Sequence, residues 1–579
     1  MKLSTPKRVG ASKGFSAQMD DKKKLVLVLI AIVTSGGIVL LLSVLQQHAL
    51  SDLMTNLSPI PSAGGPGSLY IPPEDPPNWS NFSNIYVPPG ASYTDTLFTL
   101  LKLNGSIPCH NQSTNFTKLH GLPKPRKGKV SLQYNTKYSL DLVAYTEEGK
   151  RRCSGGDYFE VDLHSDNFRS RPPTVDYGNG TYGVELEVPG SWAGVFTLEV
   201  SLLFSNWHGM DQVELAINET FCVKEVMMTK ELHVVLNETG VLDSVQQIPN
   251  MNRCTKEDFY RPHWSGRWTR GWFDENCKPD KEKRYRCLPP EHSSCEEPWC
   301  FGPLYRLESN GWSYSAHCSF KLFERDEAWE CLNNRWIVIW GDSNFQDTIR
   351  NLLLFILDWQ LPSNQNLAEF QLERKYEKFF INPYRPDQSF QVSMIFNGHH
   401  LHWDNGEGLR TLNYQEHTDW ITMHFNGTKA PDTLIMNSGL HDGYHEIDAF
   451  IEEADKAVEW WLGLYKQIPD DRKPQLLWRT TVAPAGLSRS MPGNPQKMES
   501  YNHIMMEKLK AVRHEMPVKF VDSFDMTFPF HYTNEFSDGG HYGRAPGTPL
   551  KPWYRSPHWY FVDIMLAHIW LNALCPPNV

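Results

Sequence analysis

The chain has 579 residues, several times the length of a typical single domain, so we expect two or more globular units. Hydrophobic residues make up 40% of the chain and charged residues 21%, the ordinary composition of a folded protein with sizeable cores. The 56 Lys and Arg against 67 Asp and Glu give a net charge of −11, which argues against a nucleic acid as partner.

A membrane anchor is predicted near the N-terminus. Residues 25–45 (LVLVLIAIVTSGGIVLLLSVL) carry no charge, and as a helix they would span about 31 Å, close to the hydrocarbon thickness of a bilayer. The basic residues before them, with Lys22-Lys23-Lys24 closest, place residues 1–24 in the cytosol. The alternative, a cleaved signal peptide, usually has a shorter apolar region and a small-residue cleavage site. We therefore predict a single-pass type II membrane protein, with a Pro-, Ser- and Gly-rich stalk over 46–84.

The remaining chain is expected in the lumen of the secretory pathway or outside the cell. Ten N-x-S/T sequons, eight of them between positions 78 and 237, indicate a glycoprotein; they lie at Asn56, Asn78, Asn81, Asn104, Asn111, Asn115, Asn179, Asn218, Asn237 and Asn426. Seven of the 11 Cys fall between Cys254 and Cys331 without paired C-x-x-C spacing, which favours disulfides over zinc. The sequence leaves the Golgi and the cell surface open as locations.

Residues 85–240 are predicted to form a β-sandwich. Short alternating runs broken by turns, such as 157–163, 180–190 and 194–204, are typical of such a domain. Gly155-Gly156-Asp157-Tyr158 and the run Val175 to Tyr182 resemble the pattern of a filamin-type immunoglobulin-like repeat. That resemblance implies a spacer or a module that binds a protein partner.

The second half of the chain predicts an α/β domain. Residues 250–333 are rich in Cys and Trp and are expected to form an irregular, disulfide-linked segment that packs on the domain over 334–579. Strands are predicted at 335–341, 432–438, 475–484 and 518–526, and helices at 345–358, 446–466, 498–514 and 559–574. This alternation favours a doubly wound parallel sheet with its site at the carboxyl ends of the strands.

Candidate catalytic residues follow two of these elements. Ser343, in Gly341-Asp342-Ser343-Asn344, comes directly after the first strand, and Asp538 and His541 lie in the loop before the last helix. A serine hydroxyl becomes a nucleophile when a base such as His541 removes its proton, and Asp538 would orient the imidazole. Asn437, at the end of a strand, could donate to a developing oxyanion beside the backbone N–H of Ser343.

These motifs resemble the PC-esterase branch of the SGNH (GDSL) hydrolase-like superfamily, which includes the plant trichome-birefringence-like polysaccharide O-acetyltransferases. The resemblance is carried by the GDS turn, the late D-x-x-H, the N-x-G-x-H strand end, and the approach through Gly266-Arg267-Trp268, Cys318 and Cys331. With the β-sandwich and the N-terminal anchor, the chain looks most like the neurexophilin and PC-esterase domain family. The plant enzymes place an Arg-Asn pair two or three residues after the serine, whereas Arg350-Asn351 here comes seven residues on.

The resemblance implies an SGNH-like three-layer domain and an acyl-enzyme mechanism. Ser343 would be the nucleophile, Asp538 and His541 its partners, and Ser343, Asn437 and Gly398 the oxyanion candidates. No bound cofactor is expected; an acetyl donor such as acetyl-CoA would be a co-substrate, and a glycan the acceptor. The sequence leaves transfer and hydrolysis open. The alternative is a catalytically inactive cell-surface glycoprotein that serves in adhesion or ligand binding.

Three further features have weaker chemical interpretations. His441 is an alternative base or a substrate-binding residue. Arg479 could bind a substrate carboxylate or acyl donor, but a structural salt bridge is the favoured interpretation. His399, His400 and His402 lack a Cys or carboxylate at ligand spacing, so we predict no metal.

Overall fold

The computed structural model describes residues 83–104, 112–188, 193–211, 224–235, 252–261, 264–270, 312–359, 373–398, 406–427, 429–484, 491–531, 540–544 and 561–575. All of them belong to one unit of the chain, Pro72–Val579. The predicted tail 1–24, anchor 25–45 and nearly all of the stalk 46–84 lie outside these residues. Within the described ranges, no helix is both long enough and apolar enough to cross a membrane.

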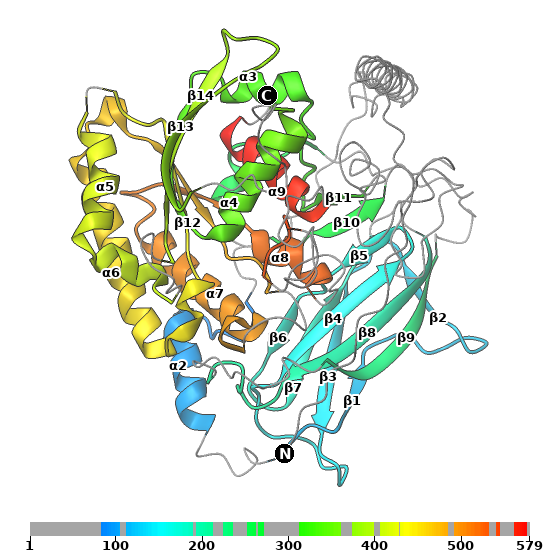
Figure 1. The fold of residues 1–579 in the computed structure, drawn as a ribbon. Helices are drawn as coiled ribbons and strands as arrows, with labels where there is room; N and C mark the ends of the chain where they lie inside the picture. Colours follow the sequence, from blue (N-terminus) through cyan, green and yellow to red (C-terminus); the bar gives the residue numbers. More distant parts are fainter. Residues whose placement is uncertain are drawn as a thin grey trace, which may run out of the picture. The chain divides into compact units, whose positions relative to one another are not determined.

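A six-stranded sheet forms the centre of the C-terminal half (Figure 1). Its order is β13 (Lys375–Ile381), β14 (Ser389–Phe396), β12 (Trp336–Gly341), β15 (Thr433–Asn437), β16 (Gln475–Arg479) and β17 (Val518–Val521). All neighbours are parallel except β13, which pairs antiparallel with β14 at one edge. Because β14 and β15 lie on opposite sides of β12, the strand order reverses between β12 and β15, where ligands bind in open α/β sheets.

Helices cover both faces of this sheet. On one face, Ile337 and Ile339 of β12 pack in a core with α3 (Arg325–Leu332), α4 (Ser343–Asn351), its π-helical continuation Leu352–Ile356, and α9 (Phe561–Leu574). On the other face, Val338 and Trp340 pack with α5 (Gln415–Asn426), α6 (Ile447–Gln467) and α7 (Pro495–Ala511). Alternate residues of one buried strand therefore supply two cores, which produces a three-layer arrangement.

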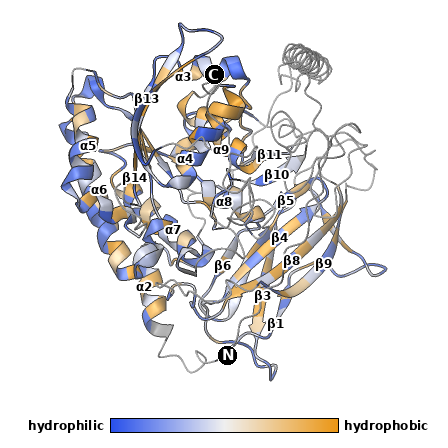
Figure 2. Cartoon of the chain, in the orientation of Figure 1, coloured by the Kyte–Doolittle hydropathy of each residue, from blue (hydrophilic) through white to orange (hydrophobic). Residues whose placement is uncertain are grey.

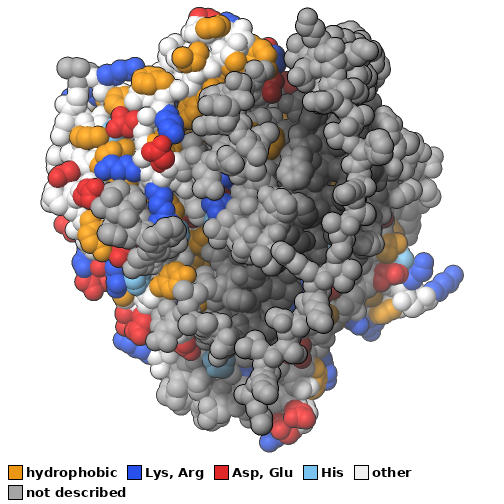
Figure 3. Space-filling view, viewed as in Figure 1, with side chains coloured by type: hydrophobic (Ala, Val, Ile, Leu, Met, Phe, Trp, Pro, Cys, Tyr) orange, Lys and Arg blue, Asp and Glu red, His pale blue; other side chains and the backbone are white. Residues whose placement is uncertain are grey.

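The outer helices differ from α9 in hydropathy. In α6 hydrophobic and hydrophilic residues alternate at helical spacing (Figure 2). By contrast, α9 is predominantly apolar, and nearly every one of its residues is buried. On the outer surface of the α5 and α6 layer, acidic and basic side chains are interspersed (Figure 3). The shorter helices are α2 (Tyr93–Asn104), α8 (Ser523–Thr527) and the 3₁₀ turns Asp258–Tyr260, Gly408–Asn413, His441–Tyr444, Asp470–Arg472, Met491–Gly493 and Phe528–Phe530.

Two further sheets enclose a separate core in the N-terminal half. One has the order β1 (Phe116–His120), β3 (Tyr138–Tyr145), β7 (Thr181–Leu186), β6 (Thr174–Asp176). The other has the order β11 (Trp312–Ser315), β10 (Arg267–Arg270), β5 (Phe168–Ser170), β4 (Tyr158–Ser165), β8 (Gly194–Phe204), β9 (Glu225–Val235), β2 (Val130–Gln133). Inward residues of β3 and β7 pack against those of β4 and β8. The Cys- and Trp-rich segment thus supplies β10 and β11 to this second sheet.

The predicted elements agree with the structure in most of the described chain. The runs 180–190 and 194–204 contain β7 and β8, and the run 157–163 overlaps β4. The predicted helix 559–574 contains α9, and the other three overlap α4, α6 and α7 with shifted ends. One strand prediction is wrong in part: the run 518–526 divides into β17 and α8. The side chain of Asp522 accepts hydrogen bonds from the N–H groups of Phe524 and Asp525, and this N-cap begins a helix where the apolar pattern predicts a continuing strand. The predicted domain boundaries are untested.

A buried ion pair joins the N-terminal sheets to the α/β half. Arg171, just after β5, donates to the carboxylate of Glu499 in α7 at 2.7 Å, and their side chains are 5% and 3% exposed. The hydroxyl of Tyr158 donates to the same carboxylate at 2.7 Å. Because a buried charge is costly without its partner, this contact fixes the register between the two halves.

We expect Arg171→Met to lower the free energy of unfolding by about 3–5 kcal/mol, because it leaves the Glu499 carboxylate buried without a cation. Lys466→Met is the control, since Lys466 and Glu515 form an ion pair with side chains 53% and 56% exposed. That change should cost less than about 1 kcal/mol. Denaturant unfolding of both variants measures the difference, and equal losses would contradict a structural role for the buried pair.

Candidate functional site

Ser343 lies at the carboxyl edge of the parallel sheet, where β12 turns into α4. Asp342 forms the N-cap of α4, and its carboxylate accepts from the N–H of Phe345 at 3.1 Å. Ser343 is therefore the first residue of the helix, so its own N–H has no partner within the helix and is available to an anion. The turn places the hydroxyl and a backbone donor that the helix itself does not use at the same point.

The structure brings His541 to this serine. The Oγ of Ser343 lies 2.7 Å from Nε2 of His541, although the two residues are 198 positions apart. At this distance the imidazole can accept the hydroxyl proton when it carries its own proton on Nδ1. Asp538, the predicted third member, lies outside the described residues, so its role stays a prediction.

Asn437 and Gly398 lie at the same edge of the sheet. Asn437 is the last residue of β15, and Gly398 follows β14. Asn437 Oδ1 accepts from the N–H of Asp342 at 3.3 Å, and Asn437 Nδ2 donates to the carbonyl of Arg479 at 3.0 Å. One amide hydrogen of Asn437 thus holds β16. Within the described part of the chain the second has no acceptor, as the predicted donation to an oxyanion requires. A Cβ on Gly398 would lie 2.5 Å from the ring of Phe396 and 3.2 Å from His441, so only glycine fits there.

His441 follows β15, and the next residue organises its loop. The ring of His441 packs edge-on against Phe396, with centroids 5.0 Å apart, and the side chain is 8% exposed. The carboxylate of Asp442 accepts from the hydroxyl of Ser438 at 2.6 Å and the N–H of Gly439 at 2.7 Å. Burial raises the pKa of Asp442 above its ordinary value. These contacts place His441 beside Gly398, whereas the described partner of Ser343 is His541.

Arg479 is buried beneath α4, 4% exposed, as the favoured structural interpretation expects. A role in substrate binding stays a prediction. The guanidinium of Arg479 donates to the hydroxyl of Ser523 at 2.9 Å and of Thr348 at 3.2 Å, and it stacks over the ring of Phe345. The cavity against it measures about 10 Å³, room for at most one water molecule. Arg479 supports α4, the helix that begins at Ser343, from the core side.

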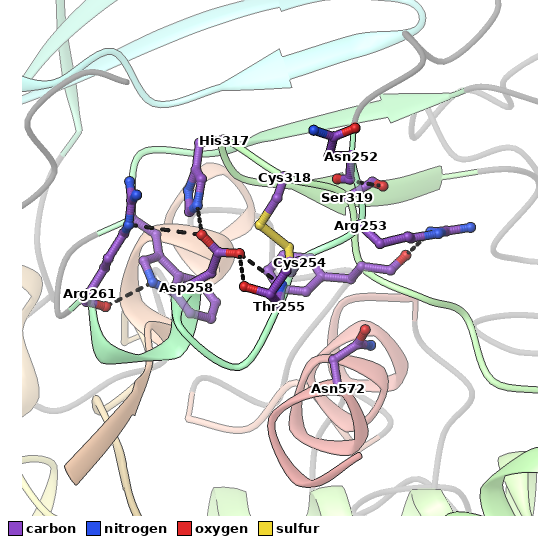
Figure 4. Close-up of a disulfide and its surroundings, with 12 residues drawn as sticks. Asn252, Arg253, Cys254, Thr255, Asp258, Arg261, His317, Cys318, Ser319 and Asn572 are labelled. Carbon is purple, nitrogen blue, oxygen red and sulfur yellow. Dashed lines mark hydrogen bonds and ion pairs between the residues drawn. A yellow bond between two sulfur atoms is a disulfide. The ribbon is translucent and has the colours of Figure 1, made fainter. Parts of the chain in front are cut away.

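In one place three residues with potential metal-ligand atoms lie close together. Asp258, His317 and Cys318 lie together, with Asp258 Oδ1 and His317 Nε2 2.6 Å apart (Figure 4). The sulfur of Cys318 is bonded to Cys254, so it cannot serve as a thiolate ligand. This cluster therefore stabilises a disulfide loop. The His399, His400 and His402 run lies outside the described residues.

Three polar side chains of α4 hold the loop that carries His541, and the sequence does not predict this role for them. Asn344, Asp347 and Asn351 are at most 3% exposed and contact residues 540–544. Their spacing of three and four residues is the one sequence signal that points to them, since it aligns polar groups along one face of a helix. That pattern is ordinary for an exposed helix, so it indicates a functional role only once burial is known.

Comparisons with known proteins give limited information. No protein-family model and no curated protein sequence matches the chain. Among solved structures, an acetyl xylan esterase from Geobacillus stearothermophilus is 14% identical over 43% of this chain and 97% of its own, with a TM-score of 0.24. A second acetyl xylan esterase gives 14% identity, 41% and 98% coverage and a TM-score of 0.24. A chloroplast translocon GTPase gives 14% identity, 43% and 86% coverage and a TM-score of 0.22. At such TM-scores these likenesses carry no argument.

A buried carboxyl of α9 gives the site a pH-dependent contribution to stability. Asp563 accepts from Thr348 Oγ1 and Asn351 Nδ2, both at 2.8 Å, and burial raises its pKa to about 6. Since this value exceeds that of a carboxyl in the unfolded chain, the folded state holds a proton that unfolding releases. The stabilising contribution is complete below about pH 4 and is lost as pH rises through about 6.

We expect Asp563→Asn to remove this part of the pH dependence. Between pH 4 and pH 7, the stability difference between variant and wild type should shift in the variant's favour by up to about 3 kcal/mol. Denaturant unfolding of both proteins across that range measures the shift. A difference that stays constant with pH would show that Asp563 titrates normally in the folded protein.

Proposed function

We propose that this chain is an acyltransferase or esterase that acts on glycans through a serine nucleophile. The observation that carries the proposal is the 2.7 Å approach of Ser343 Oγ and His541 Nε2 at the carboxyl edge of the sheet. A serine at a helix start, with an imidazole on its hydroxyl, is the minimum arrangement for nucleophilic catalysis. The turn that presents it follows a strand buried on both faces, which holds the nucleophile rigidly.

The reaction proceeds in two balanced halves. The oxygen of Ser343 bonds to the acyl carbon of the donor while its proton moves to Nε2 of His541; that proton passes to the leaving group as the donor's bond breaks. In the second half, a sugar hydroxyl gives its proton to His541 and bonds to the acyl carbon, and the proton returns to the departing oxygen of Ser343. With water in place of the sugar, the same steps hydrolyse the ester. Asp538 is proposed to hold the imidazole.

Charge on the tetrahedral intermediate needs donors at the same edge. We assign this role to the N–H of Ser343, the second amide hydrogen of Asn437 and the N–H of Gly398. The first lies at a helix N-terminus, which favours negative charge. Each such donor typically contributes about 10²–10³-fold in rate.

The choice of a glycan acceptor rests on the resemblance to the PC-esterase branch and on the proposed compartment. The ten sequons and the disulfides Cys254–Cys318 and Cys331–Cys575 suit an oxidising, glycosylating environment. We propose a type II protein anchored by residues 25–45, with its site in the Golgi lumen or at the cell surface. Sugar hydroxyls are abundant acceptors in both places.

We expect a fluorophosphonate probe to label Ser343 of the purified full-length chain stoichiometrically, because the probe reacts with serines that a base has activated. Ser343→Ala should abolish labelling, and His541→Ala should slow it by at least about 10³-fold. Peptide mass spectrometry locates and counts the label. Both variants should melt close to the wild-type temperature, since Ser343 and His541 lie in no apolar core.

The control is His514→Ala, which removes an exposed histidine beyond α7 and should leave labelling unchanged. A folded wild-type protein that stays unlabelled would contradict the proposal and favour a binding glycoprotein. Unfolding of both site variants would show that these residues are structural.

A further inference from the structure

The loop that carries His541 lies along the helix that carries Ser343. Asn344 Nδ2 donates to the carbonyl of Gly540 at 2.9 Å, one residue before the histidine. Asn351 Nδ2 donates to the carbonyl of Gly543 at 3.0 Å, two residues after it. The loop backbone is therefore fixed on both sides of His541 by side chains of α4.

A buried ion pair adds a charged contact to these two. Arg544 Nε donates to Asp347 Oδ2 at 2.6 Å, and the side chains are 15% and 2% exposed. Asp347 also accepts from Arg350 at 2.9 Å, so one carboxylate lies between two guanidinium groups. Since such charge-assisted contacts are strong and directional when solvent is excluded, they hold the loop more firmly than neutral hydrogen bonds do.

The backbone at Gly543 leaves no room for a side chain. A Cβ there would lie 2.6 Å from Asp563 Oδ2, 2.7 Å from Asn351 Nδ2 and 3.0 Å from the Cβ of Asp347. This close approach is independent of the ion pair. It shows that the loop and α4 are in direct contact at this point.

The serine and the carboxylate that pairs with Arg544 also share a face of α4. Ser343 and Asp347 are four residues apart in α4, so their side chains project from the same side, about one turn apart. His541 and Arg544 are three residues apart in the loop that faces them. The ion pair is thus a further contact, one turn along α4, between the two segments that the Ser343–His541 hydrogen bond joins.

We propose that Asp347 and Arg544 are positioning residues that hold the imidazole of His541 at hydrogen-bond distance from Ser343. They act through the loop and contact neither reacting atom. The expected effect of these residues on the reactivity of Ser343 rests on the proposed function. A displacement of about 1 Å in a catalytic group can lower a rate by about 10²-fold, so loss of the pair should be visible in the rate of serine labelling.

The test uses the full-length chain and two readouts. Fluorophosphonate labelling of Ser343 is timed between pH 5.5 and 9, and hydrogen–deuterium exchange is followed for residues 540–544. Arg544→Gln and Asp347→Asn should each slow labelling by about 10–100-fold across this pH range and speed exchange in the loop. The double variant should be no slower than the slower single one, because both changes remove one interaction. Arg544→Lys, which keeps the charge but loses the planar geometry, should fall between wild type and Arg544→Gln.

Two further variants separate positioning from folding. Gly543→Ala should displace the loop without removing a charge and slow labelling similarly. Arg335→Gln is the matched control: Arg335 pairs with Asp432 at 3.1 Å, its side chain is 26% exposed, and it precedes β12 at the opposite end of the strand from Ser343. It should leave both readouts unchanged.

Each outcome decides the inference. Faster loop exchange with slower labelling supports it. Labelling within twofold of wild type in Arg544→Gln and Asp347→Asn overturns it, whatever the exchange shows, because the pair is then structural only. If the wild type itself is not labelled, the proposed function fails and exchange alone decides: faster exchange in 540–544 upholds the anchoring of the loop, and unchanged exchange overturns it.

Discussion

The hydrogen bond between Ser343 and His541 imposes a strict geometric constraint on the fold. Its two residues come from distant parts of the chain, and its length tolerates displacements of only a few tenths of an ångström. The fold meets this constraint because the same helix, α4, holds both residues. β12 fixes the start of α4, and α4 in turn fixes the loop through Asn344 and Asp347. A small shift of α4 relative to the sheet therefore moves Ser343 and His541 together and preserves their separation.

This arrangement explains why α4 is both polar and buried. Every residue from Asn344 to Asn351 is buried, yet most carry hydrogen-bonding side chains. Buried polar groups are costly unless they are paired, and here they are paired with the loop, with Asp563 of α9 and with Arg479 beneath the helix. A helix that only filled the core would be apolar, as α9 is. The polar side chains of α4 thus indicate that the position of this helix must be fixed precisely. Apolar packing alone would fix it less precisely.

The sequence predicts the parts of the fold that rest on local pattern. The strand at 335–341 and the helix at 559–574 are apolar enough to be found without tertiary information, and Ser343 and His541 were picked out as a pair by residue type and by their places next to those elements. Two roles stayed open for Arg479, because a guanidinium at a strand end faces either the cleft or the core, and the choice depends on Thr348 and Ser523, which lie far away in sequence. The partnership of Asp347 with Arg544 was missed for the same reason. β13 was also missed, since its exposed Phe379 and Ile381 give an edge strand without a clear apolar face.

The Cys- and Trp-rich segment makes the two halves interdependent. Its strands β10 and β11 extend the N-terminal sheet, while its other groups satisfy carboxylates that follow β17. The N–H of Trp264 donates to Asp522 at 3.1 Å, and the N–H of Gly266 and the hydroxyl of Tyr314 donate to Asp525 at 2.8 and 2.6 Å. Burial raises the pKa of Asp525 to about 7, so these donors matter most near neutral pH, where the carboxyl begins to carry charge. A chain that began at the first strand of the α/β sheet would leave both carboxylates buried without these partners. The smallest folded unit that contains the serine and the histidine must therefore include this segment, and through β10 and β11 it also depends on the N-terminal sheets.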